Sequence, residues 1–340
     1  MKIQNVTLRQ AALALIAAIA LFPVSLRAAE GGVAGNKPIQ IYLLSGQSNM
    51  TGRGNLGDLN KPAAEQKATL VRYIMEPQNV EKYKFLYAGP QKNPSGWTIR
   101  DDVFIATGDR HGGLTTNYGG FRNNGFGPEL PIGHLLGDYH DEPVLLVKVA
   151  FGGCSLSKDM RPPSSGGTTG EKYPLIVQAV KDAIGKLPEI VPSHRKEAGH
   201  EIVGFFWNQG ESDMNPEAAA EYETNLVNLI KDLRKDLGAP AMKSVIAVTG
   251  FGGRNPEIGK VEIKVASEQV IAAQFAVSKH PEFKDAAATV ETRDFYRPQD
   301  PYGGNNQGIH WHANGESYWL VGEAMGRGML GLLPAKSSKP

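Results

Sequence analysis

The sequence predicts an α/β fold built on a parallel sheet that is covered by helices on both faces. Four apolar runs have the length of strands and lack polar alternation, which is typical of strands buried on both faces. Helical patterns separate these runs, and strands that alternate with helices indicate a parallel sheet. Three of the runs end in strips of small and polar residues. Because an open α/β sheet binds its ligand at the carboxyl ends of its strands, we expect one functional crevice there.

The predicted strands are apolar and partly β-branched. They cover residues 39–44, 143–150, 201–207 and 243–248, with a weaker fifth run over 286–291. The predicted helices each carry an apolar stripe and cover residues 128–136, 174–187, 216–237, 263–277 and 316–332. The helix over 216–237 has the clearest ends, because Asn215 can cap it, Pro216 suits its first turn and Gly238 follows its last residue.

Residues 1–29 are predicted to be a secretory signal peptide, since two basic residues precede an apolar run and a small-residue processing pattern. A transmembrane anchor is the alternative, but the run has about 12 residues, short of the roughly 20 that span a bilayer. We therefore expect a secreted or periplasmic protein. Residues 30–335 are expected to form a single domain in which 51–126 are an elaborated loop insertion, and 336–340 a frayed tail.

Composition excludes several classes of protein. With 36 basic and 35 acidic residues the formal net charge is +1, so no global field gathers nucleic acid or an anionic membrane. The single cysteine, Cys154, excludes an internal disulfide framework. We expect a neutral partner, no nucleic acid and no membrane after removal of the signal peptide; the oligomeric state stays open.

Ser48 lies in the first polar strip, which follows the strand over 39–44. A serine after a strand is often only the N-cap of the next helix. An α/β-hydrolase elbow requires the pattern G-x-S-x-G, and Met50 stands where its second glycine belongs, so that fold is disfavoured.

Three strips and a late histidine together resemble a known family. Residues 46–50 read GQSNM after the first strand, Gly152-Gly153 follow a later strand, and residues 207–212 read WNQGES after the next. These features resemble the SGNH hydrolases, and specifically the sialate O-acetylesterase / carbohydrate esterase family 6 (acetylxylan esterase-like) branch. The resemblance implies a flavodoxin-like three-layer α/β/α sandwich that hydrolyses acyl esters, typically acetyl groups on sugars, with Ser48 as nucleophile and without a metal or other cofactor.

The resemblance also implies an oxyanion hole. Its expected donors are the backbone amides of Ser48 and Gly153, with Gly152 as the fallback, and the side-chain amide of Gln209. A donor of this kind contributes roughly 3 kcal/mol to stabilising the tetrahedral intermediate. The alternative for Gly152-Gly153 is an ordinary turn after a strand.

The expected general base is His310, which stands just before the last predicted helix, where the family places its catalytic histidine. His312 shares a face with His310 if the segment is extended, so direction alone does not separate them. We expect His312 to be a surface or supporting group. A metal site on the pair is disfavoured, because no further ligand cluster accompanies it.

The triad acid departs from the family pattern. Most SGNH enzymes carry aspartate three residues before the histidine, and this chain has Gln307 there. In one studied triad, changing aspartate to asparagine costs about 10⁴ in rate. Glu211 is the best substitute, with Asp213 and Asp300 as runners-up, unless the enzyme uses a dyad; the alternative for Glu211 is an anchor of the Ser48 loop.

Other residues near these motifs have weaker assignments. Gln47, Asn49, Arg53 and Trp311 are candidates for substrate binding. The loop aromatics Tyr118, Phe121 and Phe126 are further candidates for stacking on sugar rings. Trp207 is expected in the core, and Glu129 at the start of a helix is expected to be structural.

Three functions are compatible with these residues. The leading one is an exported serine esterase that removes acetyl groups from carbohydrate. The second is a carbohydrate-binding pseudoenzyme, which the neutral Gln307 motivates. A flavodoxin-type phosphate site at residues 46–54 is weaker, because it leaves Gln209, Glu211 and His310 unexplained.

Overall fold

A seven-stranded, mostly parallel sheet organises the residues that the computed structural model describes, which are 37–120, 125–250, 252–256 and 260–335. Its strands are β1 Ile39–Gly46, β3 Val103–Thr107, β4 Arg110–Gly113, β6 Val144–Ala150, β7 His200–Asn208, β8 Lys243–Ala247 and β9 Ala287–Val290, and a separate two-stranded sheet consists of β2 Gly54–Asn55 and β5 Gly125–Phe126. The order in the sheet is β4-β3-β6-β1-β7-β8-β9, and only the β3–β4 pair is antiparallel. From β6 to β9 the order is that of flavodoxin-like folds.

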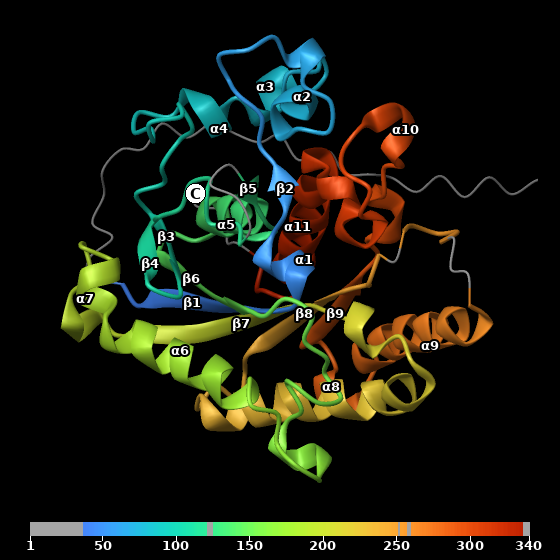
Figure 1. Ribbon diagram of the computed structural model, residues 1–340. Helices are drawn as coiled ribbons and strands as arrows, with labels where there is room; N and C mark the ends of the chain where they lie inside the picture. Colours follow the sequence, from blue (N-terminus) through green and yellow to red (C-terminus); the bar gives the residue numbers. More distant parts are fainter. Residues whose placement is uncertain (1–36, 121–124, 251, 257–259, 336–340) are drawn as a thin grey trace, which may run out of the picture. The chain divides into compact units, whose positions relative to one another are not determined.

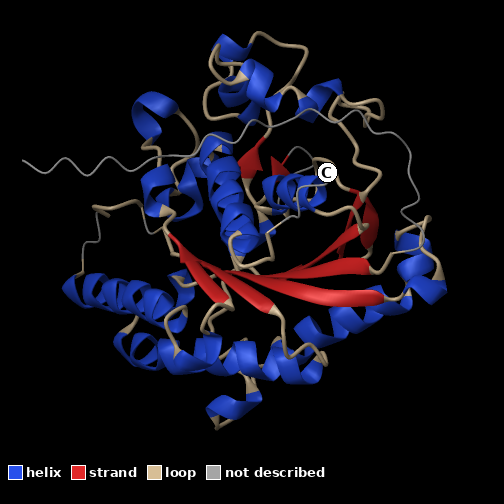
Figure 2. Cartoon of the chain, turned by 180° about the vertical axis from the view of Figure 1, so that it is seen from behind, coloured by secondary structure: helices blue, strands red, loops and turns tan. Residues whose placement is uncertain are grey.

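Helices cover both faces of the sheet, as Figures 1 and 2 show. The helices are α1 Ser48–Thr51, α2 Leu70–Ile74, α3 Val80–Tyr83, α4 Phe85–Ala88, α5 Glu129–Tyr139, α6 Tyr173–Gly185, α7 Leu187–Ile190, α8 Pro216–Asp236, α9 Val261–Val277, α10 Gln299–Tyr302 and α11 Gly315–Leu330. Helices α6, α8 and α9 lie on one face, and α5 and α11 lie on the other. The predicted three-layer α/β/α sandwich is therefore confirmed.

The alternation of side chains along each strand divides the core into two. Ile41 and Leu43 of β1 pack toward α6 and α8, whereas Tyr42 and Leu44 pack toward α5 and α11. All eight residues of β1 are buried. This explains why the strand sequences lack polar alternation, since neither face of the sheet meets water.

The predicted elements agree with those observed except at a few ends. Asn215 accepts a hydrogen bond from the amide of Ala218 (3.0 Å) and caps α8, as expected. The helix predicted over 174–187 is instead two helices, because α6 ends at Gly185 and α7 begins at Leu187. The predicted insertion over 51–126 does more than cover the strand ends, because its strands β3 and β4 extend the sheet.

The predicted signal peptide, the predicted tail and Phe121 lie outside the described residues. The single domain expected over 30–335 stays a prediction. No helix in the described part of the chain is long and apolar enough to cross a membrane.

Candidate active site

The three polar strips lie side by side because their strands are neighbours in the sheet. β1 pairs with β6 on one side and with β7 on the other, so that Gly46 lies opposite Ala150 and Asn208. This is the point where the strand order reverses, which is the usual ligand site of such a sheet. Gly46 has φ +147°, and a Cβ there would meet the carbonyl oxygen of Asn208 at 2.1 Å. Glycine therefore allows β1 to turn closely over β7 into α1.

Ser48 and His310 are brought together across 262 residues of sequence. Ser48 begins α1, directly after β1, and His310 lies on the 3₁₀ segment η8, Gly308–Ala313, that precedes α11. The Oγ atom of Ser48 lies 2.9 Å from Nε2 of His310. This separation is within reach of a proton transfer between the hydroxyl and the imidazole.

Gln307 contacts the far side of the imidazole. Its Oε1 lies 3.2 Å from Nδ1 of His310, and Nη1 of Arg53 donates to the same Oε1 at 3.0 Å. A guanidinium can only donate, so Arg53 requires the oxygen of the amide, and not its nitrogen, at this position. The oxygen in turn requires a proton on Nδ1, which leaves Nε2 free to accept the proton of Ser48.

His310 is held in its neutral form. Burial of the half-buried ring, and after it the positive charge of Arg53, lower the pKa of His310 from 6.5 to about 4. No carboxylate opposes this shift by a contact with the ring in the described residues. The imidazole is thus an unprotonated base throughout the neutral range.

Asn49 connects helix α1, which carries Ser48, to the segment that carries His310. Its Nδ2 donates to Oε1 of Glu211 (2.5 Å) and to the carbonyl oxygen of Ile309 (2.9 Å), and its Oδ1 accepts from the hydroxyl of Tyr318 (2.7 Å). Ile309 is the residue before His310. Asn49 therefore fixes where the imidazole stands relative to Ser48, and every polar atom of its side chain is committed to that task.

Glu211 lies in this network rather than on the imidazole. Its side chain accepts a hydrogen bond from Asn49, and it makes no hydrogen bond to His310 in the described residues. Burial raises the pKa of Glu211 from 4.5 to about 7. Of the two roles that the sequence left open, these contacts favour the anchor and give no support to the triad acid.

The two other candidate acids are also engaged or remote. Asp213, fully buried, accepts from the amides of Leu156 (2.7 Å) and Ser157 (2.9 Å), so it holds the loop that follows β6. Asp300 is exposed in α10 and forms no hydrogen bond with the histidine within the described ranges. Gln307 is the group that contacts Nδ1.

The expected oxyanion donors differ in availability. Ser48 contributes the first amide of α1, and Gly153 is exposed with φ +73° and donates no hydrogen bond from its amide within the described residues. Gln209 is 0% exposed, and its Nε2 donates to Asp213 (2.6 Å) and to the carbonyl of Cys154 (3.2 Å). The geometry therefore does not support Gln209 as a donor to substrate; its side chain braces the loop that carries Gly153.

Most of the weaker candidates for substrate binding are buried. Oε1 of Gln47 accepts from the amides of Gly210 and Ser212, and Asn49 has the contacts described above. Trp311 is 4% exposed, and its indole lies against Gly250. Arg53 donates to Gln307, the residue that contacts Nδ1 of His310.

The segment around the two histidines is not extended. Trp311 and His312 have φ of +54° and +53°, so His312 does not share a face with His310 in the way that an extended segment would place it. His312 is buried, with Nδ1 2.6 Å from the carbonyl of Asn305 and Nε2 2.7 Å from the hydroxyl of Tyr296. These bonds give His312 a supporting role.

A buried ion pair lies behind α1 and was not anticipated. Nζ of Lys148, in β6, lies 3.0 Å from Oε2 of Glu129, and both side chains are nearly inaccessible. The ammonium also donates to the carbonyls of Thr51 (3.0 Å) and Tyr118 (2.6 Å), so it fixes the end of α1. A lysine inside an apolar strand was the available signal, because a buried cation needs a counterion.

Two of the aromatic residues named from the sequence lie in the core. Trp207 and Phe126 are fully buried, so Trp207 is core as expected and Phe126 does not stack on a ligand. Among the described residues no group of three or more histidine, cysteine, aspartate or glutamate side chains is placed to hold a metal ion.

Comparisons with known proteins agree with this architecture. Residues 38–285 match the family model described as carbohydrate esterase, sialic acid-specific acetylesterase. A probable carbohydrate esterase of Arabidopsis thaliana is 22% identical over 236 residues, which are 69% of this chain and 78% of that protein. A crystal structure of an Arabidopsis thaliana protein superposes with a TM-score of 0.55 at 19% identity, covering 86% of this chain and 98% of the other. A carbohydrate acetylesterase of Xanthomonas citri has a TM-score of 0.47 at 15% identity, with 85% and 56% covered.

Proposed function

Because this chain belongs to the family of carbohydrate esterases described as sialic acid-specific acetylesterases, we propose that it hydrolyses O-acetyl esters of carbohydrates through an acyl-enzyme on Ser48. The observation that carries the proposal is the separation of 2.9 Å between Oγ of Ser48 and Nε2 of His310. Two residues so far apart in sequence meet at the switch point of the sheet, with the nucleophile and the base in bonding geometry.

The proposed reaction starts with proton transfer from Ser48 to His310. Nδ1 of the ring already carries a proton toward Gln307, so Nε2 takes the serine proton as Oγ bonds to the carbonyl carbon of the ester. Collapse of the tetrahedral intermediate breaks the bond to the sugar oxygen, and the imidazolium returns its proton to that oxygen. Water then repeats the sequence on the acetyl-enzyme and releases acetate.

Gln307 and Arg53 replace the usual carboxylate by a neutral, oriented acceptor. In a triad whose aspartate is changed to asparagine, the amide can select the wrong tautomer of histidine. Arg53 prevents this here, because its guanidinium can only donate and therefore requires the oxygen of Gln307, not the nitrogen, beside it. The arrangement keeps the tautomer correct and gives up the charge that would stabilise the imidazolium.

The oxyanion is stabilised by the backbone amides of Ser48 and Gly153. Each donor contributes about 3 kcal/mol at the transition state. Gln209 and Asp213 contribute indirectly, since their hydrogen bonds to Cys154 and Leu156 hold the loop that presents Gly153. A loop fixed by fully buried side chains needs no reorganisation as the charge develops.

The substrate is an acetylated carbohydrate outside the cytoplasm. The predicted signal peptide directs the chain to the periplasm or the exterior, where such polymers occur. A formal net charge of +1 suits a neutral polysaccharide better than a polyanion. Acetylated hemicellulose fits this charge argument, whereas acetylated sialic acids carry a carboxylate and are supported by the family match instead.

Acetate release from acetylated xylan, pectin and sialosides tests the proposal. We expect wild type to release acetate from at least one of them and Ser48→Ala to lose at least about 10³-fold in turnover. Ser95→Ala is the matched control, because it removes an exposed hydroxyl that has no side-chain partner in the described residues. Activity that survives in Ser48→Ala would place the reaction elsewhere.

A catalytically inert sugar-binding protein is the second candidate, and the neutral Gln307 is the observation that favours it. A serine-reactive fluorophosphonate separates the two functions. Labelling of wild type but not of Ser48→Ala establishes an activated hydroxyl, whereas an unlabelled wild type supports the inert alternative.

A further inference from the structure

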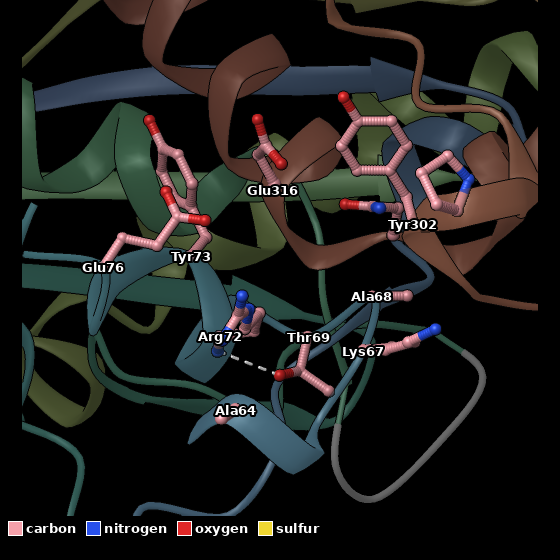
Figure 3. Close-up of a pocket in the computed structure, with 11 residues that line it drawn as sticks. Ala64, Lys67, Ala68, Thr69, Arg72, Tyr73, Glu76, Tyr302 and Glu316 are labelled. Carbon is pink, nitrogen blue, oxygen red and sulfur yellow. Dashed lines mark hydrogen bonds between the residues drawn. The ribbon is translucent and has the colours of Figure 1, made fainter. Parts of the chain in front are cut away.

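A cavity lies between the loop before α2, helix α10 and the start of α11. It has a volume of about 200 Å³ and none of Ser48, His310 and Gln307 lines it. Figure 3 shows Tyr73 and Glu76 on one side, Tyr302 on the other and Glu316 between them. The lining comprises Ala64, Lys67, Ala68, Thr69, Arg72, Tyr73, Glu76, Pro301, Tyr302, Asn314 and Glu316.

Two tyrosine rings give the cavity an aromatic character. Tyr302 is 45% exposed, although most large rings of the protein are buried. Arg297 lies over its ring at 5.9 Å, so this exposed side chain is held in place rather than extended into water. Tyr73 is fixed by its hydroxyl, which lies 3.3 Å from that of Tyr83. Held, partly exposed rings are suited to stacking on the apolar face of a sugar.

Unused hydrogen-bond donors also face the cavity. Lys67 and Arg72 are exposed, and neither side chain forms a hydrogen bond or an ion pair in the described part of the chain. Asn314 caps α11 through Oδ1, which accepts from the amide of Ser317 (3.2 Å), and its Nδ2 has no partner among the same residues. Three donors are therefore available to a ligand.

Acceptors balance these donors. Glu76 and Glu316 line the cavity, and Arg297 engages Glu316 through Oε1 at 2.9 Å. The two carboxylates offset most of the positive charge of Lys67, Arg72 and Arg297, which disfavours phosphate or another strong anion as the ligand. A neutral ligand that both donates and accepts fits best, and sugar hydroxyl groups do both.

The size of the cavity limits the ligand to one ring. Pockets for drug-sized ligands measure about 300–1,000 Å³, and this cavity is smaller than that range. A single pyranose unit of a longer chain meets the limit, with its neighbours lying in solvent. The cavity also adjoins the histidine segment, because Asn314 directly follows η8 and α10 precedes it.

We propose that this cavity is an auxiliary carbohydrate site that holds one neutral pyranose unit of an oligosaccharide chain. This auxiliary site goes beyond the proposed esterase function. It rests on that function only because its ligand belongs to the same class of polymer. Tyr302 stacks on the ring, Arg72, Lys67 and Asn314 donate to its oxygens, and Glu76 and Glu316 accept from its hydroxyl groups. Binding here raises the local concentration of polymer at Ser48.

The test is a calorimetric titration of the full-length Ser48→Ala protein with unacetylated xylohexaose and with cellohexaose. We expect Tyr302→Ala to raise the Kd of the bound oligosaccharide by about fivefold to tenfold, and Tyr302→Phe to leave it within about twofold. Lys67→Met is expected to weaken binding, and Lys92→Met, which removes an exposed lysine outside the cavity, is its control. Melting temperatures check that each variant is folded.

Three results would overturn the proposal. The first is an affinity that is the same in Tyr302→Ala and Lys67→Met as in their parent. The second is that neither neutral oligosaccharide binds. The third is tighter binding of trigalacturonate than of both neutral oligosaccharides, which would mean that the site prefers anions. Failure of the esterase function is separate, because it is read from acetate release by the otherwise unchanged protein and its Ser48→Ala variant.

Discussion

Replacing Gln307 by glutamate tests the central feature of the site, which is a histidine held by a neutral acceptor. The substitution keeps the shape of the side chain and places a carboxylate oxygen where Oε1 now lies, 3.2 Å from Nδ1 of His310. A carboxylate stabilises the imidazolium that forms when Ser48 is deprotonated. We therefore expect a higher pKa of His310 and a higher turnover.

The size of the effect follows from the distance and the exposure. Two unit charges at this separation interact by about 1 kcal/mol in a water-like medium and about 5 kcal/mol at an effective dielectric constant near 20. Gln307 is exposed, and Arg53, 3.0 Å from the same oxygen, neutralises part of the new charge. We expect the new carboxylate to stabilise the imidazolium of His310 by about 1–2 kcal/mol. This corresponds to a rise of about one unit in the pKa of His310 and of about tenfold in turnover.

The assay is the pH dependence of kcat/KM for acetate release, from about pH 4 to about pH 9. In wild type the active form of His310 is neutral, so its pKa of about 4 places the acidic limb well below the usual limb of a histidine base. In Gln307→Glu the limb moves upward by about one unit. Gln91→Glu adds the same charge at an exposed position away from the site and should change neither quantity. An unmoved limb and unchanged turnover in folded Gln307→Glu would refute the role of Gln307.

Three further predictions follow from the site. Burial, and after it the charge of Arg53, depress the pKa of His310, so Arg53→Met should raise the acidic limb only part of the way toward pH 6.5; a limb that stays in place would mean that burial alone sets this pKa. Glu211→Gln should keep turnover within about tenfold, because an amide oxygen still accepts from Asn49, and a loss near 10⁴ would instead restore Glu211 as the triad acid. The pKa of Glu211 is about 7 in the folded protein and 4.5 as the ordinary value, so the free energy of unfolding of wild type should fall by up to about 3 kcal/mol as pH rises between those values. Urea unfolding of Glu211→Gln should show no such fall. Lys148→Met should destabilise the fold by about 3–5 kcal/mol by stranding buried Glu129, and adding Glu129→Gln should recover part of that loss in urea unfolding; a further loss would contradict the pairing.

The residues at the carboxyl ends of the strands could be predicted from the sequence, because local patterns encode where each strand ends. The apolar runs specify buried strands, and the polar strips that follow must meet at one edge of a parallel sheet. Ser48 and His310, which the strand ends and the family resemblance together indicate, do lie 2.9 Å apart, and their catalytic roles stay predictions. Lys148 was overlooked although its position inside an apolar strand required a counterion.

The partners of each side chain could not be predicted in the same way. The sequence suggests roles in catalysis or substrate binding for Glu211, Gln209 and Asn49, yet their side chains bond to other parts of the protein. Glu211 accepts from Asn49, Asn49 accepts from Tyr318, and Gln209 donates to the carbonyl of Cys154. The sequence indicates that such side chains lie near the site, but it does not determine the direction in which each one points. Burial decides the rest, because a buried polar atom must find a partner, and the nearest partner here is the protein itself.

The sequence by itself determined the layers of this protein and the residues at the edge where its strands end. The reason is that hydrophobic periodicity and the residues that begin or end helices and strands act over a few residues. Only the tertiary structure decided that an amide turned by Arg53, rather than a carboxylate, contacts the imidazole of His310. That choice depends on angles and separations of about 3 Å between chain segments more than 250 residues apart, which no local pattern records.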